Sequence, residues 1–156
     1  MTAILKNAPD LCRWWPSVYL DVKVLKEGDE NGIGKQVELF TKGWLPYTLR
    51  WKFEVTDSNE PYGFTIEAIG DFIGKGIWTF TPDSNMVRIT YDWNITAEKG
   101  ILKHFSFLLK PIFKANHLWA MRKGEESLKL ELLRRNTRNK DIPLPPSPTF
   151  YPKQKA

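Results

Sequence analysis

The stretch PIFKANHLWAMRKGEESLKLELLRR, residues 111–135, is the one segment in which apolar residues recur at the spacing of a long α-helix. Steps of three or four residues from Phe113 bring a set of mostly apolar or small residues onto one face. These residues are His117, Ala120, Met121, Gly124, Leu128 and Leu132. Pro111 fits the first turn of a helix, where its missing N–H costs no hydrogen bond. We therefore predict an amphipathic helix that begins at Pro111.

The residues before this helix alternate between apolar and polar side chains, which is the pattern of half-buried strands. The clearest case is TLRWKFEVT, residues 48–56, where Trp51 and Phe53 fall on one face and Arg50 and Lys52 on the other. Further strands are predicted at residues 19–25, 35–41, 64–68 and 87–95, and around Trp78 and Phe80. The short polar connections between them are typical of hairpins.

Half-apolar strands joined by hairpins form an antiparallel sheet with one dry face, and that face needs a cover. The long helix is the natural cover, so strands followed by a helix predict an α+β fold. Two short helical pieces are expected in residues 1–18, where Trp14 and Trp15 are interpreted as a plug for one end of the core. The apolar run 101–109 is predicted as a separate helical lead-in, which forms either a lid or, as we favour, part of the core.

The chain of 156 residues is long enough for one globular domain, which we place at residues 1–136. Residues 137–156, TRNKDIPLPPSPTFYPKQKA, hold five of the eleven prolines, so we expect an extended or disordered basic tail there. The run IPLPPSP would suit an aromatic groove on another protein, but we favour a tail without a specific partner.

The net charge of +5 is concentrated at the C-terminal end. Residues 134–156 carry six basic residues and one acidic residue, so residues 1–133 sum to zero. The folded part therefore lacks the basic surface typical of nucleic-acid-binding folds, and we expect no nucleic-acid partner.

Other function classes find little support in the sequence. We expect neither a membrane span nor a secretory signal, because the chain has no run of about 18 apolar residues and no typical leader. The single cysteine, Cys12, cannot form an internal disulfide, which favours a cytoplasmic location. Two histidines and one cysteine without ligand spacing predict no metal site. Gly74 and Gly76 are interpreted as lying between strands and do not open a helix, as a phosphate loop would, so we expect no cofactor.

Four segments carry a resemblance to a known family. They are GIGKQVELFTKGWLPYTLRWKFEV at residues 32–55, IGDFIGKGIWTF at 69–80, VRITYDW at 87–93 and KANHLWAMRKGEESLKLEL at 114–132. In their hydrophobic and glycine positions, residues 8–135 resemble the polyketide cyclase/dehydrase branch of the START-like superfamily, also called SRPBCC or helix-grip proteins. The resemblance implies a curved antiparallel sheet that grips the long C-terminal helix, with a deep hydrophobic cavity for lipids, polyketides or quinones between them.

The N-terminal end departs from the pattern of this family. Its members usually begin with a strand and a helix pair, whereas this chain starts at what resembles the end of the first helix. We expect that the true start lies upstream of Met1, that the sheet is one strand short, or that a neighbouring molecule supplies the strand. An open sheet edge would favour a homodimer.

The predicted ligand-binding residues are those that face the cavity implied by the resemblance. They are Trp51, Phe53, Phe64, Ile66, Trp78, Phe80, Tyr91 and Trp93 from the sheet, and Phe113, His117, Ala120, Met121 and Gly124 from the helix. Gly124 either makes room for a ligand or allows close approach to the sheet. His117 with Tyr91 forms either a general acid-base pair or, as we favour, a histidine that is satisfied in the core or orients a ligand.

Three functions follow as hypotheses. The first is binding of a small hydrophobic molecule in a cofactor-free cavity, for transport or sequestration. The alternative is a cyclase, aromatase or dehydratase in which His117 acts as acid or base with help from Tyr91. The third is an interaction module that acts through the proline-rich tail or an open sheet edge.

Overall fold

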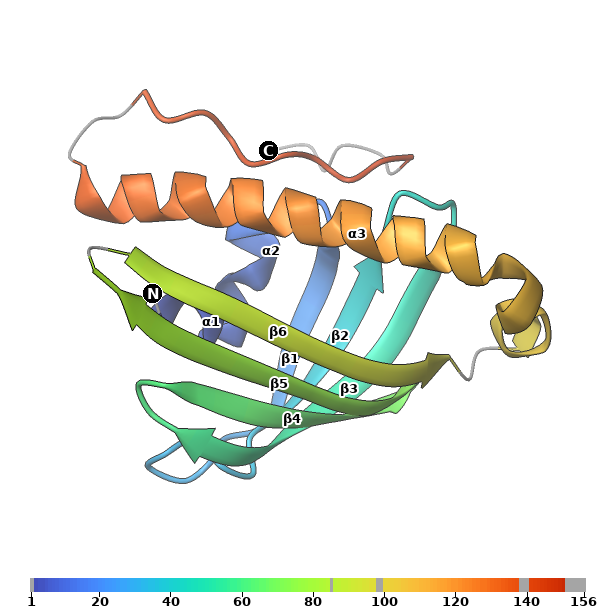
Figure 1. Cartoon of the computed structure of the whole chain (residues 1–156), viewed down its shortest axis with the longest axis horizontal. Coiled ribbons are helices and arrows are strands. Elements are labelled where there is room, and N and C mark those ends of the chain that lie inside the picture. Colours follow the sequence, from blue (N-terminus) through green and yellow to red (C-terminus); the bar gives the residue numbers. More distant parts are fainter. Residues whose placement is uncertain (1, 85, 98–99, 138–140, 151–156) are drawn as a thin grey trace.

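The predicted α+β fold is confirmed by the computed structural model, which describes residues 2–84, 86–97, 100–137 and 141–150. Six strands form one antiparallel sheet in sequence order. They are β1 Tyr19–Lys26, β2 Gln36–Lys42, β3 Thr48–Asn59, β4 Gly63–Gly70, β5 Phe72–Asp83 and β6 Met86–Ala97. The sheet curves, and its concave side faces the long C-terminal helix α3, Gly100–Asn136 (Figure 1).

The prediction that Gly74 and Gly76 lie between strands is wrong, because β5 runs through both. Their role is to allow β6 to pack closely. A Cβ at Gly76 would lie 2.6 Å from the indole ring of Trp93, its partner across the strand pair. The missing side chain therefore leaves room for the Trp93 ring on the concave face.

The prediction of a helix that begins at Pro111 after a separate lead-in is also wrong. Helix α3 is continuous from Gly100, and Pro111 lies inside it. Figure 1 shows that the first turns of α3 bend away from the axis of the rest, as expected where a proline removes one backbone hydrogen bond. Whether 101–109 form a lid or core depends on side chains that lie outside the described part of the chain.

Three short helical segments lie on the concave side beneath α3 (Figure 1). They are α1 Thr2–Leu5, the 3-10 helix η1 Ala8–Asp10 and α2 Leu11–Trp14. Trp14 is fully buried and Trp15 nearly so, and both belong to the core cluster with Val37, Leu39 and Trp51 of the sheet. The interpretation of the paired tryptophans as part of the core is therefore confirmed.

Gly124 lets α3 approach the N-terminal segment closely. A Cβ built at Gly124 would lie 2.3 Å from Cζ2 of Trp15, well inside van der Waals contact. Of the two roles considered for this glycine, the structure supports close packing, although the partner is the Trp15 ring and not a strand.

An ion pair with a buried carboxylate fixes the same contact between the two ends of the chain. Glu131 of α3 is only 2% exposed, and Arg13 of α2 donates to both of its carboxylate oxygens, at 2.9 and 2.8 Å. Arg135 donates to Oε1 at 2.8 Å, and Asp10 accepts a second bond from Arg13 at 3.1 Å. Hydrogen bonds from Arg13, reinforced by Arg135, lower the pKa of Glu131 to about 2.

Residues 141–150 of the tail run alongside α3 (Figure 1). Residues 141–150 form no helix or strand. The Thr149 hydroxyl lies within donating distance of the carbonyls of Gly43 and Trp44, at 3.4 and 3.3 Å, and the Thr149 carbonyl accepts from Nζ of Lys42. This part of the tail is thus extended and docked on the connection between β2 and β3.

Within the described residues, no helix is both long and apolar enough to cross a membrane. The expected homodimer through a sheet edge stays a prediction, since β1 and β6 each pair with one neighbouring strand in this chain.

Replacement of Glu131 by glutamine should lower the free energy of unfolding by about 2 kcal/mol, because hydrogen bonds between charged groups contribute about that much. Urea unfolding at neutral pH measures the change. Glu125→Gln is the matched control, since the exposed Glu125 pairs with Lys129 on the helix surface. Equal stability of both variants would contradict the role of the Arg13–Glu131 pair.

The same carboxylate makes stability depend on pH. Its pKa is lower in the folded protein, about 2, than its ordinary value of 4.5, so its contribution is complete above about pH 4.5 and is lost as the pH falls toward 2. The wild-type protein should therefore lose more stability over this interval than Glu131→Gln. Parallel curves for the two proteins would refute this.

Substitution of Gly124 by alanine should destabilise the protein by about 1–3 kcal/mol through overlap with the Trp15 ring, although alanine favours helices by about 1 kcal/mol. Ala115→Gly, at an exposed position of the same helix, measures the propensity term alone. A stabilised Gly124→Ala variant in urea unfolding would show that the contact is not tight.

Candidate functional site

A half-open cavity of about 730 Å³ lies between the sheet and α3, and we call it the large cavity. Its floor comes from β3, β5 and β6, its roof from α3 and one end from the segment after α2. The principal lining residues are Trp15, Tyr19, Trp51, Phe72, Trp78, Tyr91, Trp93, Phe113, His117, Ala120 and Met121. Most of these side chains are apolar or aromatic, as is usual for sites that bind small molecules.

Stacked rings form the floor of the large cavity. Trp78 and Tyr91 face each other across β5 and β6, and their rings stack with centroids 3.9 Å apart at 16°. Trp93 continues the row, 5.3 Å from Tyr91 and 5.6 Å from Trp51. Residues two apart on a strand share a face, so the alternating sequence of β6 places Tyr91 and Trp93 side by side. The result is a flat apolar surface that suits a planar ring or an alkyl chain.

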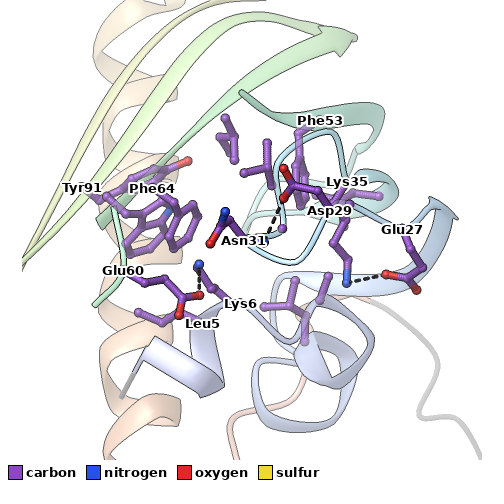
Figure 2. A pocket seen from close by; sticks show the side chains of 18 of the residues that line it. Leu5, Lys6, Glu27, Asp29, Asn31, Lys35, Phe53, Glu60, Phe64 and Tyr91 are labelled. Carbon is purple, nitrogen blue, oxygen red and sulfur yellow. Dashed lines mark hydrogen bonds and ion pairs between the residues drawn. The ribbon is translucent and has the colours of Figure 1, made fainter. Parts of the chain in front are cut away.

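A second cavity of about 310 Å³, the small cavity, lies at the other side of these rings. Five aromatic residues line both cavities and so form a partition between them: Trp15, Tyr19, Trp51, Trp78 and Tyr91. Figure 2 shows the small cavity, with Phe64 and Tyr91 on one side and Glu27 and Lys35 on the other. Its lysines are already paired, Lys6 with Glu60 and Lys35 with Glu27.

The structure divides the predicted ligand-binding residues between the two cavities. Trp51, Trp78 and Tyr91 line both. The large cavity adds Trp93, Phe113, His117, Ala120 and Met121, whereas the small cavity adds Phe53, Phe64 and Ile66. Two predicted residues line neither: Phe80 is 4% exposed and packs 6.1 Å from Phe64, and Gly124 packs on Trp15.

His117 and Tyr91 do line one cavity, but they have different surroundings. His117 is open to solvent on one side, and its partial burial lowers its pKa below 6.5. Burial, with a smaller effect from Tyr19, raises the pKa of Tyr91 far above 10. At neutral pH both groups are therefore uncharged. No carboxylate among the described residues hydrogen-bonds to His117, so the orienting group that an acid-base histidine usually has is missing there.

Cys12 is a poor nucleophile in this structure. Burial, with a smaller effect from Asp21, raises the pKa of its thiol to about 11. The reactive thiolate is therefore scarce at neutral pH. In the part of the chain that the structure describes, no group of three His, Cys, Asp or Glu side chains could hold a metal ion.

Sequence patterns missed several lining residues, above all Lys42, Tyr47 and Asn116. Lys42 ends β2 and is only 3% exposed, because Thr149 of the tail covers it. Asn116 holds α3 to the β2–β3 connection, where its Oδ1 accepts from the Leu45 amide at 3.2 Å. Alternation within a strand gives no signal for contacts to a tail more than 100 residues away. Asn116, in contrast, precedes His117 in the helix and was identifiable as a polar residue near the apolar face.

Comparison with known proteins gives no relative from which a role could be transferred: no family model matches the chain, and no curated protein or solved structure matches it significantly.

Proposed function

We propose that this protein binds a small hydrophobic molecule in the large cavity and carries or sequesters it without chemical change. The observation that carries the proposal is the cavity itself, about 730 Å³ with a floor of stacked aromatic rings. This volume lies within the usual range for ligand pockets, roughly 300–1,000 Å³. Transfer of apolar ligand surface from water onto such rings provides the driving force.

Membership of the START-like superfamily is part of the same proposal. A curved sheet around a long C-terminal helix is compatible with the helix-grip arrangement. Lipids, polyketides and quinones, which that resemblance implies as ligands, have the apolar rings or chains that this floor could accommodate.

An enzyme of the cyclase, aromatase or dehydratase type is the second candidate. It is favoured by the presence of His117 and Tyr91 on the walls of one cavity. The neutral imidazole could accept a proton, and the neutral phenol could donate a hydrogen bond to a carbonyl. The binder remains our preferred function because His117 lacks an orienting carboxylate among the described residues.

A neutral fluorescent probe, pyrenebutanol, should bind the wild-type protein and quench tryptophan emission by energy transfer, since four tryptophans line the large cavity. Ala120→Trp should weaken binding at least about tenfold, or ~1.4 kcal/mol, because the added ring fills the cavity. Ala115→Trp is the matched control on an exposed position of α3. Circular dichroism and urea unfolding show whether both variants fold. Absence of saturable binding to the wild type, or equal effects of the two substitutions, would contradict the proposal.

His117→Ala separates the binder from the enzyme. For a binder, the substitution should change pyrenebutanol affinity by less than about threefold, as it removes one wall residue that is partly exposed. Mass spectrometry of ligands extracted from the wild-type and variant proteins should then give the same masses. A product that only the wild-type protein accumulates would favour the enzyme.

A further inference from the structure

The connection between β2 and β3 forms part of the wall of the large cavity. Its first and last residues, Gly43 and Tyr47, both line the cavity. Residues 43–47 form no helix or strand, and we call them the rim loop. A loop without ladder hydrogen bonds depends on other elements for its position. The contacts of the rim loop therefore decide how firmly this side of the half-open cavity is closed.

Helix α3 holds the rim loop through one side chain, Asn116. Its Oδ1 accepts from the Leu45 amide at 3.2 Å. The Gly43 backbone packs against the same side chain so closely that a Cβ at this position would overlap the Asn116 amide. Asn116 itself lines the large cavity. The contact thus joins the roof of the cavity to its rim.

The tail holds the same loop from outside the cavity. The Thr149 hydroxyl lies 3.4 and 3.3 Å from the carbonyls of Gly43 and Trp44. The Thr149 carbonyl accepts from the ammonium of Lys42, which stands 5.8 Å from the centre of the Phe150 ring. Alternation along β2 places this lysine side chain on the face opposite Thr41, which lines the cavity. Neither Thr149 nor Phe150 lines the cavity.

The tail is attached to α3 as well as to the rim loop. The Pro143 carbonyl accepts from Arg134 near the end of α3, and residues 141–150 run alongside the helix (Figure 1). Four of these ten residues are prolines, which fix the backbone and reduce the entropy lost when the segment docks. Movement of the rim loop away from α3 would break the contacts of Thr149 together with the Asn116–Leu45 bond.

We infer that residues 141–150 act as a strap that holds the rim loop against α3 and so limits the rate at which a ligand enters and leaves the large cavity. This inference rests on the proposed function and adds a device that controls ligand exchange. Because the strap lies outside the cavity, it stabilises the closed state without touching the ligand. Its release should raise the association and dissociation rates by the same factor and leave the affinity unchanged.

Stopped-flow fluorescence with pyrenebutanol tests the strap in the full-length chain. Replacement of residues 141–150 by ten glycine and serine residues keeps the length but gives a flexible coil. Both rate constants should rise about tenfold or more, while the dissociation constant stays within about threefold of the wild type. Thr149→Val, which removes only the hydroxyl, should raise both rates about threefold, as expected for one neutral hydrogen bond.

Ser147→Ala is the matched control, because it removes an exposed hydroxyl from the same segment. Both rates should stay within about twofold of the wild type. Circular dichroism and urea unfolding show whether the variants fold, and Thr149→Val carries the test if the replaced tail prevents folding. Hydrogen exchange without ligand provides a second readout, in which the amides of the rim loop should exchange faster once the tail is replaced.

Unchanged rates in both folded tail variants would overturn the strap and leave the proposed function intact. A weaker affinity with an unchanged association rate would also overturn it, since the tail would then belong to the binding wall. Equal exchange of the rim-loop amides in the wild type and the replaced-tail variant would do the same. Failure of the wild-type protein to bind pyrenebutanol would overturn both proposals.

Discussion

The ion pair between Arg13 and the buried Glu131 carboxylate holds together parts of the chain that line the cavities. It ties α2 to the last turns of α3, and Trp15 follows directly after α2. Trp15 in turn packs against Gly124 and lines both cavities. This ion pair therefore helps to hold the helix above the sheet, together with the Asn116–Leu45 hydrogen bond and the packing of Gly124 on Trp15. Removal of either charge would affect a site formed by residues that the charges do not touch.

The Arg13–Glu131 ion pair also illustrates how charged and apolar groups are distributed in the molecule. Charged residues are buried where they have partners, as Glu131 has in Arg13 and Arg135. The large cavity instead lies between this ion pair and the bent start of α3, and it is lined mainly by aromatic rings. Lys42 is buried as well, and its ammonium donates to the Thr149 carbonyl of the tail.

The sheet was predictable from the sequence because each strand is half buried. Alternation in residues 48–56 and 87–95 marks the inner face directly, and it identified Trp51, Tyr91 and Trp93 as cavity residues. Alternation could not predict which inward-facing residues are covered by other parts of the chain. Phe80 is buried by its neighbours, and Gly124 packs against the Trp15 ring, so neither lines a cavity. The prediction that α3 begins at Pro111 was wrong because neighbouring turns of the helix tolerate the lost hydrogen bond. Lys42 escaped notice because its burial depends on the tail.

The simple order of the sheet has a consequence for how the chain folds. Every strand pairs with its neighbour in sequence, so each hairpin closes only a short loop. By contrast, the ion pair between Arg13 and Glu131 joins residues 118 positions apart, and the bond between Lys42 and Thr149 of the tail joins residues 107 positions apart. We therefore expect the sheet to form early and the two ends to join last. During synthesis the aromatic face would stay uncovered until α3 has left the ribosome, and in that interval the nascent chain would be most prone to aggregate or to need a chaperone.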